Sequence, residues 1–272
     1  MKGIRTLAVD LDPQANLAGD FGAQKEGAAD SGGSLHAAVT GYARLQVLPR
    51  VRPGIDLVPA GHYTRELSDW MASVRRDDPT VMLVVREALA TVSSDYDLVL
   101  IDTPPAPTHM SVAGIHAADW VLAPIRADFA SIDGLEQVRY GLDQMSELGI
   151  RTPRMLGVAL FDVHSQSKAV ISEIREAVAQ RAHWAGPVFD AVIRRSERSA
   201  LDMRRWGLLA DEYRDRSSLA LATAAAKHRI ASKGLDESVA RFSRAADALA
   251  RDYDHLGEQA LGRMAELMTR AA

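Results

Sequence analysis

Short apolar runs recur along this chain, and a longer stretch with helical periodicity follows most of them. The runs are four to six residues long, rich in Val, Ile and Leu, and apolar at odd and even positions alike. This pattern is typical of strands buried on both faces. The runs cover residues 6–9, 55–59, 98–101, 120–125, 157–161 and 188–193. Strands that alternate with helices predict an α/β fold with a mostly parallel, doubly wound sheet and flanking helices.

Helical patterns occupy the stretches between these runs and the end of the chain. They cover residues 81–92, 132–148 and 169–182, and after Tyr213 they continue over 219–230, 238–249 and 256–268. The first pattern follows Asp78-Pro79, a helix start signal, and the second ends at Gly149, a common C-terminal residue of helices. No internal repeat or low-complexity linker appears. We therefore expect one α/β domain over residues 1–233 and a helical C-terminal extension over residues 234–272.

Composition excludes several classes of protein. Hydrophobic residues at 47% and charged residues at 25% are ordinary for a globular chain, which excludes a disordered or collagen-like one. The chain has no cysteine, so disulfide scaffolds, zinc–thiolate sites and thiol catalysis are excluded. No apolar run approaches the roughly 20 residues that a membrane span needs, and the first residues do not form a signal peptide. We expect a soluble cytoplasmic protein whose histidines, scattered without ligand spacing, are structural or on the surface.

Two of the predicted strands end in carboxylates. Asp10 and Asp12 follow the first strand, and Asp102 follows the strand at residues 98–101, before a Thr-Pro-Pro loop. Ligands of open α/β sheets bind beyond the carboxyl ends of the strands. An apolar strand that brings one aspartate to its tip is typical of a Walker B element, which orients Mg²⁺, usually through water. Aspartate also ends strands because it favours turns, so both interpretations of Asp102 stay open.

These motifs resemble the ParA family of partition ATPases, which belongs to the deviant P-loop class together with MinD. The resemblance rests on VDLDPQANL (9–17), IDLVPAG (55–61), DYDLVLIDTPP (95–105), ADWVLAPIRADFASIDGL (118–135) and VFDAVIRRSERSALDMRRWG (188–207). It spans about residues 4–230. It implies a P-loop NTPase fold, ATP and Mg²⁺ as cofactors, and ATP hydrolysis in plasmid or chromosome segregation. It also implies a ParB-like centromere-binding partner, non-specific DNA, an ATP-bound homodimer and a location on the nucleoid.

The resemblance assigns a role to each acidic residue. Asp12 would position the attacking water, and Asp10 would support that water and the metal. Asp102 would hold the Mg²⁺ shell through water, with Asp12 as the second carboxylate near the metal. Thr103 would begin the second switch loop, and Gln14 belongs to the expected cofactor-binding set.

The family's glycine-rich phosphate loop, KGGxGK[ST][ST], does not occur in this sequence. The five lysines, none of them in such a pattern, are Lys2, Lys25, Lys168, Lys227 and Lys233. Gly3 resembles the glycine that ends the helix after the phosphate loop, so we expect the chain to begin after the first β-α unit and to lack its strand. Three explanations of the missing phosphate loop stay open: an upstream start, a decayed gene fragment and a nucleotide-free variant. The alternative function is a non-catalytic ParA-like interaction protein.

Arginines gather near the end of the last predicted strand, where the acids between them are Glu197 and Asp202. These arginines are Arg194, Arg195, Arg198, Arg204 and Arg205. By resemblance they are candidates for non-specific contacts with DNA phosphates. The second interpretation is a solvated face, because arginine is abundant along the whole chain. The last predicted helix balances basic with acidic residues, so we expect it to pack on the core or in a dimer and not on a membrane.

Overall fold

The computed structural model describes residues 3–23, 29–105, 108–147, 149–164, 168–219 and 237–270. The chain divides into two compact units. The first comprises Met1–Asp119 and Gln137–Arg154, and the second comprises Trp120–Glu136 and Met155–Ala272. The domain boundary expected between residues 233 and 234 lies outside the described residues and stays a prediction.

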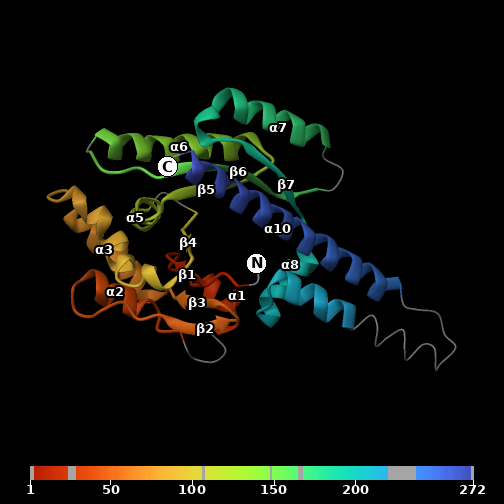
Figure 1. Cartoon of the computed structure of the whole chain (residues 1–272), viewed down its shortest axis with the longest axis horizontal. Helices are drawn as coiled ribbons and strands as arrows, with labels where there is room; N and C mark the ends of the chain where they lie inside the picture. The colour runs from red at the N-terminus through yellow and green to blue at the C-terminus, as the bar shows by residue number, and fades with distance from the viewer. Residues whose placement is uncertain are drawn as a thin grey trace. The chain divides into compact units, whose positions relative to one another are not determined.

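The first unit contains a four-stranded sheet of order β2-β3-β1-β4 (Figure 1). Its strands are β1 (Thr6–Asp10), β2 (Leu48–Arg52), β3 (Ile55–Val58) and β4 (Leu98–Asp102). β1 lies parallel to both β3 and β4, as predicted, and β2 runs antiparallel to β3. β2 was not among the predicted strands, because Leu-Pro-Arg-Val-Arg contains a proline and two charges, which an edge strand tolerates.

Short helices pack together in this unit. They are α1 (Asn16–Asp20), α2 (Gly33–Val39), α3 (His62–Val74), α4 (Val84–Ala90) and α5 (His109–Ala117), with 3₁₀ turns η2 (Pro79–Leu83) and η3 (Ser93–Asp95). The predicted helix over residues 81–92 is therefore a 3₁₀ turn followed by α4. α3 was not among the predicted helices, although Leu67, Trp70, Met71 and Val74 recur at helical spacing and pack in one apolar cluster.

β4 has the sequence of an internal strand but an edge position. Its residues are apolar at both parities, which is typical of the internal strands of a parallel sheet that is covered on both faces. Among the described residues, its strand neighbour is β1 alone. As a result, 52% of Leu100 is exposed to solvent.

The second unit contains the sheet β5-β6-β7, formed by β5 (Trp120–Arg126), β6 (Arg154–Val163) and β7 (Val188–Arg194). Alternate residues of a strand point to opposite faces. Ala123 and Ile125 of β5 pack in one apolar cluster with residues of α6 (Phe129–Glu147) and α7 (Lys168–Arg181). Trp120 and Leu122 pack in another cluster with α10 (Glu237–Thr269). Figure 1 shows α7 and α10 on opposite sides of β6 and β7, the predicted doubly wound arrangement.

The C-terminal region is helical, as predicted. After the 3₁₀ turn η4 (His183–Ala185) and β7 come α8 (Glu197–Trp206), a helix over residues 210–219, and α10. The two helices predicted over 238–249 and 256–268 are one continuous helix, because residues 250–255 between them contain neither proline nor glycine. Residues 220–230 of the predicted helix over 219–230 lie outside the described residues.

In the described part of the chain, no helix combines the length and the apolar character that crossing a membrane requires.

Candidate functional site

Asp10 organises the acidic loop that follows β1. Its side chain is fully buried, and its Oδ1 and Oδ2 accept hydrogen bonds from the backbone N–H groups of Asp12, at 3.0 Å, and Leu17, at 3.2 Å. The Oδ1 of Asp12 accepts one from the backbone N–H of Gln14 at 2.9 Å. Ala15 then adopts a left-handed φ of 54° and precedes α1. The carboxylate of Asp10 thus shapes the loop, whereas Asp12 is half-buried and Gln14 is exposed.

The end of β4 lies beside this loop. Asp10 and Asp102 are partners in the parallel register, and the N–H of Leu11 donates to the carbonyl oxygen of Asp102 at 2.9 Å. Thr103 follows, half-buried. The structure therefore places the predicted cofactor and catalytic residues on two neighbouring strand ends: Asp10, Asp12 and Gln14 on one, Asp102 and Thr103 on the other.

Negative charge is crowded at this edge of the sheet. Burial, with the charges of Asp102 and Asp12, raises the pKa of Asp10 to about 7, against the opposing effect of its two N–H donors. Burial and the charges of Asp12 and Asp20 raise the pKa of Asp102. Asp20, at the end of α1, is the residue that the sequence analysis missed, and its place just after the DLDPQANL motif was the available signal. Such a site favours a cation.

The site residues fit Mg²⁺ better than they fit a nucleotide. Magnesium prefers oxygen ligands, which Asp12 and Asp102 supply. No group of three or more His, Cys, Asp or Glu side chains poised to hold a metal occurs within the described ranges, so the role of these two residues stays a prediction. The charges that raise the pKa of Asp10 and Asp102 are all negative, whereas a triphosphate needs positive charge and N–H donors. The acidic residues of this site therefore do not include the groups that would bind the phosphates.

The sequence and fold match known proteins. The family model AAA_31, described as an AAA domain, matches residues 1–151. Chromosome partitioning protein ParA of Myxococcus xanthus is 26% identical over 196 residues, covering 71% of this chain and 66% of that protein. Chromosome-partitioning ATPase Soj of Thermus thermophilus is 31% identical over 205 residues, covering 73% of this chain and 72% of that protein. The chain belongs to the ParA family of partition ATPases.

Solved structures agree with this ParA-family assignment. Apo McdA of Cyanothece is 26% identical with a TM-score of 0.63, covering 76% of this chain and 81% of that one. An ATP complex of a McdA variant gives a TM-score of 0.64 at 25% identity, covering 78% and 79%. Cobyrinic acid a,c-diamide synthase of Mycobacterium smegmatis, at 22% identity and a TM-score of 0.58 over 76% and 81%, shares the fold.

The arginines predicted to bind DNA lie in the second unit and have different partners. The guanidinium of Arg194 donates two hydrogen bonds to Asp252 of α10, Nε to Oδ2 at 2.6 Å and Nη2 to Oδ1 at 2.7 Å, and the backbone N–H of Arg194 donates a third to Oδ2 at 3.1 Å. The Nε of Arg195 donates to Glu197 at 3.0 Å. Arg194 therefore fastens α10 to the end of β7 in this ParA-family chain.

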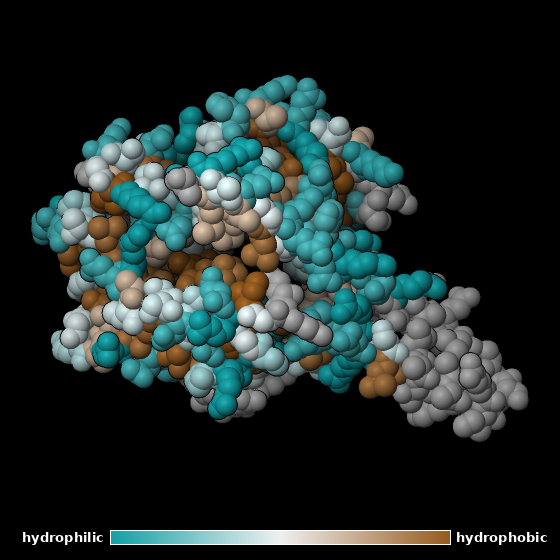
Figure 2. Space-filling view, viewed as in Figure 1, coloured by the Kyte–Doolittle hydropathy of each residue, from teal (hydrophilic) through white to brown (hydrophobic). Residues whose placement is uncertain are grey.

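The other three predicted arginines lie on α8. Arg198 donates to the buried Asp202 at 2.9 Å while 77% of its own side chain stays exposed. Arg204 and Arg205 are exposed almost two turns later. Figure 2 shows a predominantly hydrophilic surface over α8. The structure thus separates the five arginines into a group at the end of β7 and a group on the exposed side of α8.

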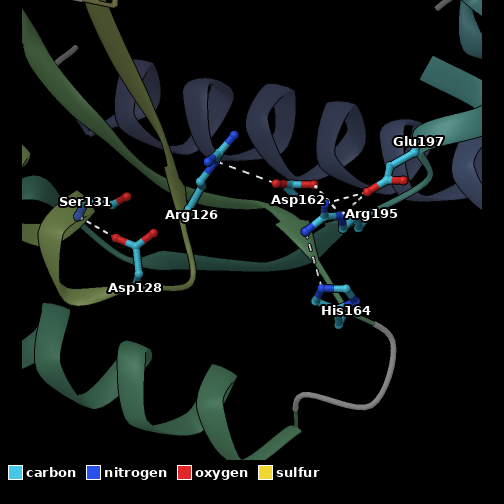
Figure 3. Close-up of polar contacts among 7 residues, drawn as sticks. All are labelled: Arg126, Asp128, Ser131, Asp162, His164, Arg195 and Glu197. Carbon is cyan, nitrogen blue, oxygen red and sulfur yellow. Dashed lines mark hydrogen bonds and ion pairs between the residues drawn. The ribbon is translucent and has the colours of Figure 1, made fainter. Parts of the chain in front are cut away.

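A second polar cluster lies at the carboxyl ends of the strands of the second unit (Figure 3). The carboxylate of Asp162 lies between Arg126, whose Nε is 3.6 Å away, and Arg195, whose Nε is 3.8 Å away. The Nη1 of Arg195 is 3.4 Å from Nε2 of His164. Asp162 has a left-handed φ of 57° in β6, where the pairing with β7 changes register. Sequence reasoning missed Arg126 and Asp162, because only the strand pairing brings them to Arg195.

Proposed function

We propose that this chain acts in DNA segregation as a ParA-type ATPase whose hydrolysis site is the carboxyl edge of β1 and β4. One observation carries the proposal: Asp10 and Asp102, from two family motifs, are partners in the β1–β4 register. Asp12, the more accessible carboxylate of its loop, would orient water, and Asp102 would hold the hydration shell of Mg²⁺. Asp10 would preserve the loop's shape, with Thr103 and Gln14 beside the site.

The phosphate-binding groups would join this site at the open edge of β4. In the family, the strand that precedes the glycine-rich loop lies beside the Walker B strand. An apolar β4 in an edge position, with Leu100 half exposed, supports the addition of such a strand there. ATP would supply the phosphoryl group once its phosphates are held by that loop.

Hydrolysis by a chain extended with the family's phosphate-loop β-α unit tests the assignment. We expect Asp12→Ala to lower kcat by about 100-fold or more, because a group that positions the nucleophile contributes about that much. The control is Asp69→Ala, which removes an exposed carboxylate of α3 and should leave kcat unchanged. Equal rates for the extended wild type and Asp12→Ala would reject the proposed role.

The alternative function is a non-catalytic ParA-like interaction protein. The absence of the phosphate-loop pattern from this sequence favours it. Thermal unfolding of the 272-residue chain tests the shared premise of both functions, that ATP does not bind without the phosphate loop. Because the sequence contains no phosphate-binding loop, the chain should have the same Tm with Mg²⁺ and ATP as with Mg²⁺ alone. If the extended chain also fails to hydrolyse ATP, the alternative is supported.

We also propose that the partners are a ParB-like centromere-binding protein and non-specific DNA, with an ATP-bound homodimer as the active form on the nucleoid. The DNA-contacting residues would be Arg198, Arg204 and Arg205, because all three are exposed on α8. Arg194 and Arg195 would mainly support this surface through Asp252 and Glu197.

The salt dependence of DNA binding tests the α8 surface. Each phosphate contact contributes about 0.9 to the slope of log K against log salt concentration. The double variant Arg204→Ala/Arg205→Ala should therefore bind more weakly and lower the slope by about 2. Arg5→Ala removes an exposed arginine from the first unit and should leave the slope unchanged. A double variant with the wild-type slope would place the DNA contacts elsewhere.

A further inference from the structure

Gly114 lies buried in the middle of α5, against the ends of both β1 and β4. A Cβ atom at this position would lie 2.8 Å from Cδ1 of Leu11 and 2.8 Å from Cγ2 of Thr103. Leu11 directly follows Asp10, and Thr103 directly follows Asp102. The helix therefore contacts the residue after each acidic strand end.

The backbone does not require glycine at this position. Gly114 is absent from the residues with positive φ, so a side chain is compatible with its helical conformation. Glycine is also less favourable than alanine inside a helix. The start of α5 is fixed by a capping box between Thr108 and Ser111. What glycine provides at position 114 is space.

Of the two neighbours of Gly114, Leu11 has little room to move away. Leu11 is fully buried in the apolar cluster that also contains Val9 and Met110. Its backbone N–H donates to the carbonyl oxygen of Asp102 at 2.9 Å, the hydrogen bond that joins the two acidic segments. A displacement of Leu11 or Thr103 would therefore act directly on that hydrogen bond.

We propose that Gly114 is a positioning residue of the acidic site. Its missing side chain lets α5 approach both strand ends, so that the Leu11–Asp102 hydrogen bond forms and Asp12 and Asp102 lie on adjacent segments. The use of this site in catalysis rests on the proposed function. The geometry itself is a property of this chain without nucleotide.

Amide hydrogen exchange, followed residue by residue by NMR in the nucleotide-free chain, tests the proposal. In Gly114→Ala, the N–H groups of Leu11 and Asp12 should exchange at least about 10-fold faster, because their acceptors on Asp102 and Asp10 move. Amides in the middle of β1 should keep their protection. The matched control is Gly262→Ala on α10, where nothing lies within 4 Å of the new Cβ. It should leave the exchange of Leu11 and Asp12 unchanged.

A rescue variant separates positioning from general packing. Thr103→Ser removes Cγ2, which with Cδ1 of Leu11 is one of the two atoms that lie 2.8 Å from the new Cβ, and keeps the hydroxyl group. In Gly114→Ala/Thr103→Ser, exchange at Leu11 should return at least partly toward the rate of Thr103→Ser alone. Faster exchange in Gly114→Ala without any return in the double variant would overturn the proposal.

The remaining outcomes are equally decisive. If Gly114→Ala only raises the Tm by about 2–4 °C, as expected for a Gly→Ala change in a helix, with wild-type exchange at Leu11 and Asp12, Gly114 has no positioning role. If Gly114→Ala does not fold, recovery of folding by Thr103→Ser with Leu11→Val supports the proposal, and continued failure overturns it. Since exchange needs no nucleotide, failure of the proposed ATPase function would leave these results standing.

Discussion

Gly157→Ala is expected to lower the free energy of unfolding by on the order of 3 kcal/mol, through steric collision and backbone strain together. Gly157 lies in β6 with a φ of 153°. A Cβ there would lie 2.6 Å from the carbonyl oxygen of Pro187 and 3.0 Å from Cε2 of Phe189. That carbonyl oxygen accepts the hydrogen bond of the Val158 N–H at 2.8 Å. The substitution would therefore push β7 away from β6 where their pairing begins.

Chemical denaturation measures this loss, with Gly41→Ala as the control. Gly41 also has a positive φ, 80°, but nothing lies within 4 Å of its Cβ position. This control should cost only the left-handed backbone strain, about 1–2 kcal/mol. Equal losses for the two variants would show that the contact between β6 and β7 at Gly157 is looser than described.

The free energy of unfolding of Asp10→Asn minus that of the wild type is expected to be higher at pH 8 than at pH 4. The pKa of Asp10 is about 7 in the folded protein, above its ordinary value of 3.8. The folded state therefore binds this proton more tightly, so the contribution of Asp10 to wild-type stability is lost as the pH rises from about 4 to above 7. Asparagine does not titrate and avoids this loss. The difference between the two proteins should change by on the order of 3 kcal/mol over this range.

The comparison uses denaturation at several pH values in metal-free buffer. His116, whose pKa burial lowers to about 4, titrates in both proteins, so its contribution cancels in the difference. Asparagine retains one acceptor for the N–H groups of Asp12 and Leu17, which adds a constant offset of about 1 kcal/mol. Parallel stability curves for wild type and variant would mean that Asp10 is ionised at ordinary acid pH in the folded state.

The local periodicity of the sequence was enough to predict most strands of both sheets. β1 and β4 contain continuous apolar runs and β3 is apolar apart from Asp56, and such patterns are visible without any tertiary information. β2 was missed for a physical reason: an edge strand tolerates Pro49, Arg50 and Arg52, so its sequence contains no continuous apolar run. The apolar residues of α3 do recur at helical spacing, so the same periodicity could have predicted this helix.

The partners of the arginines near the end of β7 could not be predicted from the local sequence. The sequence predicts one basic group from the composition of residues 194–205. The structure instead joins Arg194 to Asp252, a residue 58 positions along the chain. Pairing of this kind depends on α10 packing against β7, which no local pattern contains.

By itself, the sequence determined the family of this protein, the alternation of strands and helices, and the placing of Asp10 and Asp102 at strand ends. These properties follow from side-chain periodicity and from motifs, both of which are local. Only the tertiary structure decided that the two acidic ends are neighbours, that Asp10 is buried against backbone N–H groups, and that Gly114 leaves space for both loops. Strand register and close packing join residues distant in the chain, and their chemistry becomes specific only when the sheet forms.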